Sequence, residues 1–229
     1  MRTILQSYKG LTASLLVFTM SFVLGYSAVE PKLLQAVGDQ FIITQSVTAE
    51  ISFITTANDV AMNGSIAGLT GGTSNGSTQV AVLTNNAAGY TMVLQASSSP
   101  AMQGDTQGGY INDYTPGTPL VPDYTFSVGS NTGEFAYTVS ASTTSDLDSK
   151  FLDNGSACDA GGSSDTSGSD SCWLNASTTD VTIIDRGSAT GATGATTTIY
   201  FRVQITANPS PAIPQDTYTA TTTLTATTK

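Results

Sequence analysis

The sequence predicts an all-β protein whose antiparallel strands pack as a sandwich. Three observations support this prediction. Apolar residues recur at every second position in many short segments, which is the period of a strand with one buried face. Turn-forming Gly, Pro and Asn residues separate these segments, as they do in β-sandwiches. No helical pattern follows the first 28 residues, so we expect no helix in the body of the domain.

We expect at least seven strands, in the order in which the alternating segments occur. They are residues 47–53, 80–82, 90–94, 124–128, 135–141, 181–184, 199–205 and 217–227. Short antiparallel strands of this kind favour an immunoglobulin-like sandwich, with a closed barrel as the alternative. No internal repeat divides the chain, so residues 41–229 are predicted to form a single domain.

The connections between these strands are predicted from clusters of turn residues. Residues 64–78 contain Gly71-Gly72 and Asn75-Gly76 and are interpreted as a turn-rich stretch. Residues 85–89 are interpreted as a hairpin connection. The remaining long segments are expected to be surface loops, at residues 97–122 and 146–180.

The last predicted strand has the strongest pattern in the chain. Every odd-numbered residue from Thr217 to Thr227 is threonine, and the even positions include Tyr218, Ala220 and Leu224. Threonine suits an exposed strand face because its branched Cβ favours an extended backbone and its hydroxyl needs no buried partner. We therefore expect the even residues to face the core and the threonines to face solvent.

Residues 1–28 resemble an export signal. Arg2 and Lys9 precede an apolar run, and the small residues that follow favour cleavage before Ala28. Two alternatives remain open: an uncleaved anchor helix, and a type IV pilin leader cut after Gly10. Residues 29–40 would then be a short lead-in to the domain.

Composition excludes several classes of function. The chain carries 17 acidic and 7 basic residues, a net charge of −10, and removal of Arg2 and Lys9 with the signal would make it −12. Such a surface repels nucleic acid and anionic lipid. Histidine is absent, which excludes Ser-His-Asp and Cys-His catalysis and His-ligated zinc. The sequence therefore predicts a protein that is not an enzyme.

The two cysteines, Cys158 and Cys172, are expected to form a disulfide that closes a polar loop. Aspartates cluster around this pair, and their oxygens suit calcium. The candidate ligands are Asp146, Asp148, Asp153, Asp159, Asp165 and Asp170. No EF-hand spacing is present, so a solvated acidic loop is the simpler interpretation, and no other cofactor is expected.

A carbohydrate-binding patch is a further alternative. Asp113 stands between Tyr110 and Tyr114, and Trp173 is the only tryptophan that could offer a stacking platform. Tyrosines in such loops more often pack locally. Only three glutamates are present, which disfavours a glycosidase with paired carboxylates.

Two segments resemble bacterial cell-surface β-sandwich proteins of the WxL-domain type. Residues 85–94, Asn-Asn-Ala-Ala-Gly-Tyr-Thr-Met-Val-Leu, are similar to that family's Gly-Trp-x-Leu strand, with Tyr90 and Met92 in the positions of Trp and Leu. Residues 216–227 are similar to its closing Gly-Thr-Tyr-Thr strand. The resemblance implies a β-sandwich displayed at the bacterial cell wall.

We expect an exported, non-catalytic protein of the cell surface with a structural or adhesive role. Its partners would be the cell envelope, a surface glycan or copies of itself. One alternative is a fibre subunit, completed by an extended segment of a neighbour within residues 41–53 or packed through a pilin-like helix. Another alternative is a secreted carbohydrate-binding module.

Overall fold

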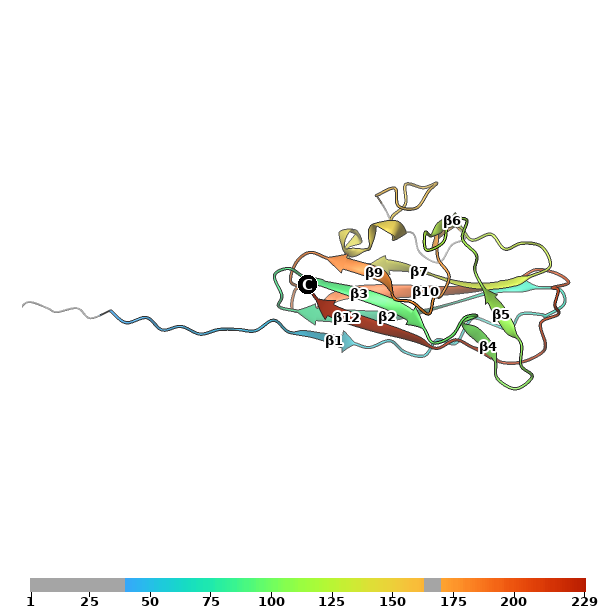
Figure 1. Ribbon diagram of the computed structural model, residues 1–229, viewed down its shortest axis with the longest axis horizontal. Coiled ribbons are helices and arrows are strands. Elements are labelled where there is room, and N and C mark those ends of the chain that lie inside the picture. The colour runs from blue at the N-terminus through green and yellow to red at the C-terminus, as the bar shows by residue number, and fades with distance from the viewer. Residues whose placement is uncertain (1–39, 163–169) are drawn as a thin grey trace, which may run out of the picture. The chain divides into compact units, whose positions relative to one another are not determined.

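The computed structural model describes residues 40–162 and 170–229. The chain forms two compact units, Met1–Ser46 and Val47–Lys229. Residues 40–46 are the described part of the first unit, and they form neither helix nor strand. The predicted signal or anchor helix lies outside the described residues. All strands of the described chain belong to the second unit (Figure 1).

Two antiparallel sheets form the body of the second unit. The larger sheet contains, in spatial order, β1 (Ile51–Thr55), β2 (Gly72–Thr84), β10 (Ala195–Ile205), β7 (Gly133–Ala141), β5 (Tyr110–Asp113), β4 (Met102–Gly104) and β11 (Tyr218–Thr219). The smaller sheet contains β12 (Thr222–Thr228), β3 (Tyr90–Ala96) and β9 (Val181–Arg186), in that order. The β5–β7 pair is parallel, unlike the other pairs of these sheets. The prediction of a mostly β, sandwich-like protein is confirmed.

The remaining elements are short. A two-stranded ribbon consists of β6 (Asp123–Thr125) and β8 (Asp170–Trp173). Two 3₁₀ turns, η1 (Thr144–Asp146) and η2 (Ser149–Phe151), precede the disulfide loop. In the described part of the chain, no helix has the length and apolar character needed to cross a membrane.

The main core lies between the two sheets and is built by the alternating strands. In β10 every odd residue from Ala195 to Ile205 is buried and every even residue is half-buried. This strand pairs with β2 and β7 along its length and is the centre of the larger sheet. The strands predicted around residues 135–141, 90–94, 181–184 and 199–205 are all present.

The prediction of a turn-rich stretch at residues 64–78 is wrong for its second half. β2 begins at Gly72 and includes Asn75 and Gly76, because β10 supplies a partner for each residue from Gly72 to Val82. Gly76 is also a point of close packing. A Cβ built there would lie 2.5 Å from Val60 Cγ1 and 2.9 Å from Met62 Sδ. Pairing and packing therefore override the local preference of Asn-Gly for a turn.

The predicted hairpin at residues 85–89 is also wrong. β2 belongs to the larger sheet and β3 to the smaller one, so this segment carries the chain from one sheet to the other. The corner is fixed locally: Gly89 N donates to Asn86 O at 2.9 Å, and Asn86 Nδ2 donates to Gly89 O at 2.9 Å. Gly89 has a φ of 81°, a conformation that favours glycine.

The terminal threonine strand is divided between the two sheets. β11 pairs with β4, whereas β12 pairs with β3. The predicted faces are confirmed, since the odd threonines are exposed and the even residues are more buried. However, Leu224 and Ala220 are only partly buried against the core. The apolar face of this strand is therefore incompletely covered.

The first predicted strand begins later than expected. β1 starts at Ile51, and residues 47–50 are not part of a strand. Val47 is 83% exposed, so it does not share the buried face of Ile51 and Phe53 as predicted.

The loop predicted at residues 97–122 contains β4 and β5, which extend the larger sheet. The strand predicted at residues 124–128 is reduced to β6. β8, which the sequence did not indicate, pairs with β6 and brings Trp173 into a second, smaller core with Phe126 and Tyr114.

Cys158 and Cys172 form the predicted disulfide, with their Cα atoms 5.7 Å apart.

We expect removal of the Cys158–Cys172 disulfide to lower the melting temperature without abolishing the fold. Closing a loop of this length stabilises by ~3 kcal/mol in the chain-entropy model. The disulfide packs against the main core, but most of that core consists of residues on the strands of the two sheets. Thermal unfolding followed by circular dichroism, with and without reductant, measures the change. The Cys158→Ser/Cys172→Ser variant is the control and should not respond to reductant. Equal melting temperatures for the variant and the parent protein would contradict the prediction.

Candidate functional site

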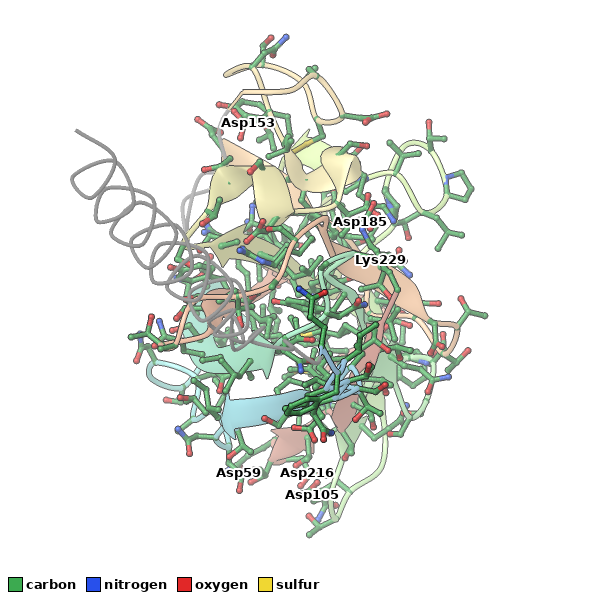
Figure 2. All side chains as sticks on the ribbon, turned by 90° about the vertical axis from the view of Figure 1, so that its left-hand side faces the viewer. Asp59, Asp105, Asp153, Asp185, Asp216 and Lys229 are labelled. Atoms are coloured by element: carbon green, nitrogen blue, oxygen red, sulfur yellow. A yellow bond between two sulfur atoms is a disulfide. The ribbon has the colours of Figure 1, made fainter. Side chains whose placement is uncertain are left out.

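The aspartates of the predicted calcium site bind different partners and do not converge on one point in the described chain. Asp146 forms an ion pair with Arg186, and Asp148 lies 3.5 Å from Lys150 Nζ. Asp153 is buried and accepts from Gly155 N at 2.9 Å, whereas Asp170 lies on β8. Figure 2 shows Asp153 on the opposite side of the view from Asp59, Asp105 and Asp216.

Asp159 is exposed, and Asp165 lies outside the described residues. Among the residues that the structure describes, no three His, Cys, Asp or Glu side chains gather as a metal site would require. The calcium site therefore stays a prediction without a geometric counterpart.

Two of the residues considered for sugar binding, Tyr114 and Trp173, are buried, whereas Asp113 is half-buried and Tyr110 is exposed. Tyr114 is stacked on Phe126 at a centroid distance of 4.9 Å and donates to Asp123 Oδ2 at 2.9 Å. Burial raises the pKa of this tyrosine well above its usual value. Asp113 accepts from Ala101 N and from Ser99 Oγ, both at 2.8 Å. Trp173 is fully buried, so it offers no platform to a ligand.

The structure contains a groove between the two sheets, which is the candidate site. It has a volume of about 900 Å³ and is open to solvent on one side. Its floor consists of buried apolar side chains: Val80, Leu94, Met102, Phe135, Ile199 and Phe201. The sequence assigned all of them except Met102 to the core, whereas Met102 was predicted to lie in a surface loop. An engineered apolar cavity of about 150 Å³ holds a benzene molecule, so this groove has room for several apolar side chains.

One rim of the groove is formed by the C-terminal segment, residues 217–224. In the described residues, β12 is an end strand of the smaller sheet and pairs with β3 alone. An edge strand presents backbone N–H and C=O groups to solvent, and natural proteins often protect such edges with charged residues or proline. Residues 222–228 contain neither. β12 therefore lacks these protecting residues and has no hydrogen-bonded partner on its outer edge, although β1 lies near part of it.

The other rim is the irregular segment that follows β1, residues 56–62. It runs beside β2 without joining the sheet. Asn58 N donates to Thr78 Oγ1 at 2.9 Å, and Thr78 Oγ1 donates to Asn58 O at 3.1 Å. Val60 and Met62 pack partly against the core from this side. β1 and β12 lie next to one another (Figure 1).

Several apolar residues around the groove share incomplete burial. Phe53, Val60, Met62, Tyr218, Ala220 and Leu224 line it and are partly buried against the core. In a complete sandwich such side chains would be covered on both sides. The groove therefore leaves these side chains without full cover in the described chain.

Asp216 fixes the end of the rim formed by the C-terminal segment. Its carboxylate accepts from Gln107 N at 2.7 Å, from Thr106 N at 2.9 Å and from Thr106 Oγ1 at 2.8 Å. These bonds connect the β4–β5 turn to the start of β11. The backbone hydrogen bonds from Gln107 and Thr106 lower the pKa of Asp216 to about 2.

We expect the Asp216 contact to be insensitive to pH until strongly acidic conditions. The folded-state pKa lies below the ordinary value of 3.8, so the contact is fully present above that value and is lost as pH falls through about 2. The amide resonances of Thr106 and Gln107 should titrate with this midpoint in NMR spectra. Asp216→Asn is the control and should remove the titration. A midpoint near 3.8 would contradict the assignment.

The lining of the groove has little capacity for acid–base chemistry. Its titratable side chains are Asp59 and Tyr218, and the rest are apolar residues, threonines and Asn58. Tyr218 is engaged, since its hydroxyl donates to Pro214 O at 2.8 Å. An apolar floor between hydroxyl-bearing rims and a free strand edge suits an extended peptide with alternating apolar side chains.

Comparison of the chain with protein-family models, with curated proteins and with solved structures gives no match. The resemblance to WxL-type domains therefore stays a prediction. Sequence reasoning recognised the threonine strand and the floor residues other than Met102 but did not predict the groove between them. One signal was available: residues 222–228, which continue the apolar face of residues 218–226, contain no charged residue and no proline.

Proposed function

We propose that this chain is an exported, non-catalytic, immunoglobulin-like β-sandwich of a microbial cell surface, and that it has a structural role as a subunit of an assembly. The observation that carries the proposal is the open groove beside the free edge of β12. A sandwich with a vacant strand position accepts an extended segment by strand addition, which is a common way for surface proteins to assemble.

Two features support export. The Cys158–Cys172 disulfide is typical of an oxidising compartment. The first 28 residues have the basic start, apolar run and small residues of an export signal. N-terminal sequencing of the mature protein tests this part. A start at Ala28 fits soluble export, a start at Leu11 fits a pilin-like helix, and an intact Met1 on a protein retained in the cytoplasm contradicts export.

The groove also supports a structural role over a catalytic one. General acid–base catalysis requires titratable groups that converge on one reacting atom. The lining offers Asp59 and a tyrosine whose hydroxyl is already bonded, and the chain contains no histidine. An unprotected β-edge is a hazard to a monomeric secreted protein, and a covering partner removes that hazard.

The test is the assembly state of the mature chain. Size-exclusion chromatography with light scattering and negative-stain microscopy, over a range of concentrations, should show oligomers or fibres. A panel of purified surface polysaccharides serves as the comparison. A chain that stays monomeric at every concentration and binds a polysaccharide would contradict the proposal and favour the carbohydrate-binding alternative.

A further inference from the structure

The segment before β1 exposes an unusual number of large apolar side chains. Phe41 is 80% exposed, Ile42 is 92% exposed, and Ile43 and Val47 are each 83% exposed. Residues 40–50 form no helix or strand. Exposed apolar patches of this kind on a soluble protein commonly mark an interaction site.

The same segment has the pattern of a strand with one apolar face. The odd positions Phe41, Ile43, Val47 and Ala49 are apolar, with Gln45 between them. The even positions from 44 to 48 are threonine or serine. Ile42 is the apolar exception on the face formed by the even positions. Alternation with period two predicts a strand that inserts one row of side chains into an apolar site.

We propose that residues 41–49 of a second copy of this chain occupy the groove as an added strand on the free edge of β12. The proposal rests on the proposed function and names the partner that completes the sandwich. The odd-numbered side chains would fill the groove above Leu94, Ile199 and Phe201, and the threonines would face solvent, as they do in β12.

The direction in which the chain enters β1 favours a second copy over the chain's own groove. Ile51 pairs with Thr84, near the end of β2. Just before it, Glu50 N donates to Asn85 Oδ1 at 2.7 Å and Asn85 Nδ2 donates to Thr48 O at 3.0 Å. These bonds hold residues 48–50 in line with β1, beyond the end of its partner strand. A return into its own groove would require a reversal at the residues that Asn85 holds.

Each copy would then give one strand and receive one. This contact is head-to-tail, and such contacts produce open filaments when the rotation between copies does not close a ring. A neutral segment also avoids repulsion between chains of high negative charge, because residues 40–49 contain no charged side chain.

The first test compares two charge substitutions on opposite faces of the segment. Ile43→Asp combined with Val47→Asp should abolish assembly, because an unpaired carboxylate would have to enter the apolar groove. Thr44→Asp is the matched control on the solvent face and should assemble like the parent chain. Light scattering and negative-stain microscopy measure both variants. Equal loss in both, or assembly of the double variant, overturns the proposal while leaving a structural role through another surface.

The second test supplies the strand as a peptide. A labelled peptide of residues 40–50 should bind the full-length mature Ile43→Asp/Val47→Asp variant, whose groove is intact. Fluorescence anisotropy should show affinity weakened by roughly tenfold or more when the peptide carries Asp at positions 43 and 47. No binding of the parent peptide overturns the proposal. The proposal is also overturned if the peptide binds the variant but the parent chain is strictly monomeric. The segment of each chain would then fill the groove of that same chain.

The third test separates donor from acceptor. Ala220→Trp places a large side chain on the rim and should block the groove while leaving the donor segment free. Mixed with the Ile43→Asp/Val47→Asp variant, it should give a 1:1 complex and no fibres. Fibres from Ala220→Trp alone overturn the proposal. If this variant does not fold, the peptide test decides the proposal by itself. A parent chain that neither assembles nor binds the peptide removes the proposed function as well.

Discussion

Replacing Trp173 with alanine is expected to lower the free energy of unfolding by about 3–5 kcal/mol. Trp173 is fully buried in the smaller core, where its ring meets Phe126 edge-on at 5.4 Å between centroids. The guanidinium of Arg202, on β10, lies 5.9 Å from the Trp173 ring and 5.6 Å from the Phe126 ring. The variant would lose ring contacts and cation–π attraction and would leave a cavity beneath the β6–β8 ribbon.

Urea unfolding followed by far-ultraviolet circular dichroism measures the effect of Trp173→Ala. Tyr110→Ala is the matched control, since Tyr110 is an aromatic residue with 47% exposure, and it should cost less than about 1 kcal/mol. Trp173→Phe should fall between the two, because it keeps an aromatic ring in the site. If Trp173→Ala is no more destabilising than Tyr110→Ala, the ribbon does not pack on the larger sheet as the structure describes.

The strands that the sequence predicted best are those whose alternation is long and uninterrupted. β10 is central in the larger sheet, and its odd residues face the main core, so burial determines its pattern. β7 is buried on both faces at its centre, because Phe135, Tyr137 and Val139 pack in the main core and Ala136 packs in the smaller one. Thr217–Thr227 also shows its faces clearly. The alternating pattern does not indicate the sheet to which each part of this segment belongs. The chain passes from the larger sheet to the smaller one between β11 and β12 without a break in the period of two.

The errors in the sequence-based prediction have a common physical cause. Asn75-Gly76 and residues 85–89 carry similar turn residues, yet the first lies within a strand and the second at a corner between sheets. The difference comes from partners that are distant in sequence. β10 pairs with the first segment. β3, which follows the second segment, pairs with β12 and β9 and not with β2. Local preference is weak compared with such pairing, so it does not determine these positions.

The groove was not predictable because its floor residues have the same sequence pattern as a closed core. Ile199 and Leu94 have the sequence pattern of ordinary core residues, and they are buried in the structure as well. Only the partial burial of Leu224, Ala220 and Phe53 around them distinguishes the groove from a closed core. The exposed segment before β1 was recognisable from its alternation, which is why the sequence pointed to a strand-adding partner without indicating where it binds.

Substitutions across the groove are expected to rank by depth: Ile199→Ala most damaging, Leu224→Ala intermediate, and Thr223→Ala least. Ile199 has no exposed surface on the groove floor, so its loss should cost about 2–5 kcal/mol. Leu224 is only partly buried on the rim, so the single chain should lose about 1 kcal/mol, a fraction of the value for full burial. Thr223 is exposed and should cost less than about 0.5 kcal/mol. Urea unfolding of the Ile43→Asp/Val47→Asp background measures all three without interference from assembly.

The same three substitutions in the assembling chain give a second, sharper expectation. An added strand would cover Leu224, so Leu224→Ala should become more damaging in the assembled protein than in the single chain, whereas the cost of Ile199→Ala should change little. Thr223 is an exposed residue of the rim and should stay nearly neutral in both states. If Thr223→Ala proves more damaging than Leu224→Ala, the face assignment of β12 is wrong. The threonine row would then be the buried contact, and the covering partner would lie on the opposite face of the strand from the groove.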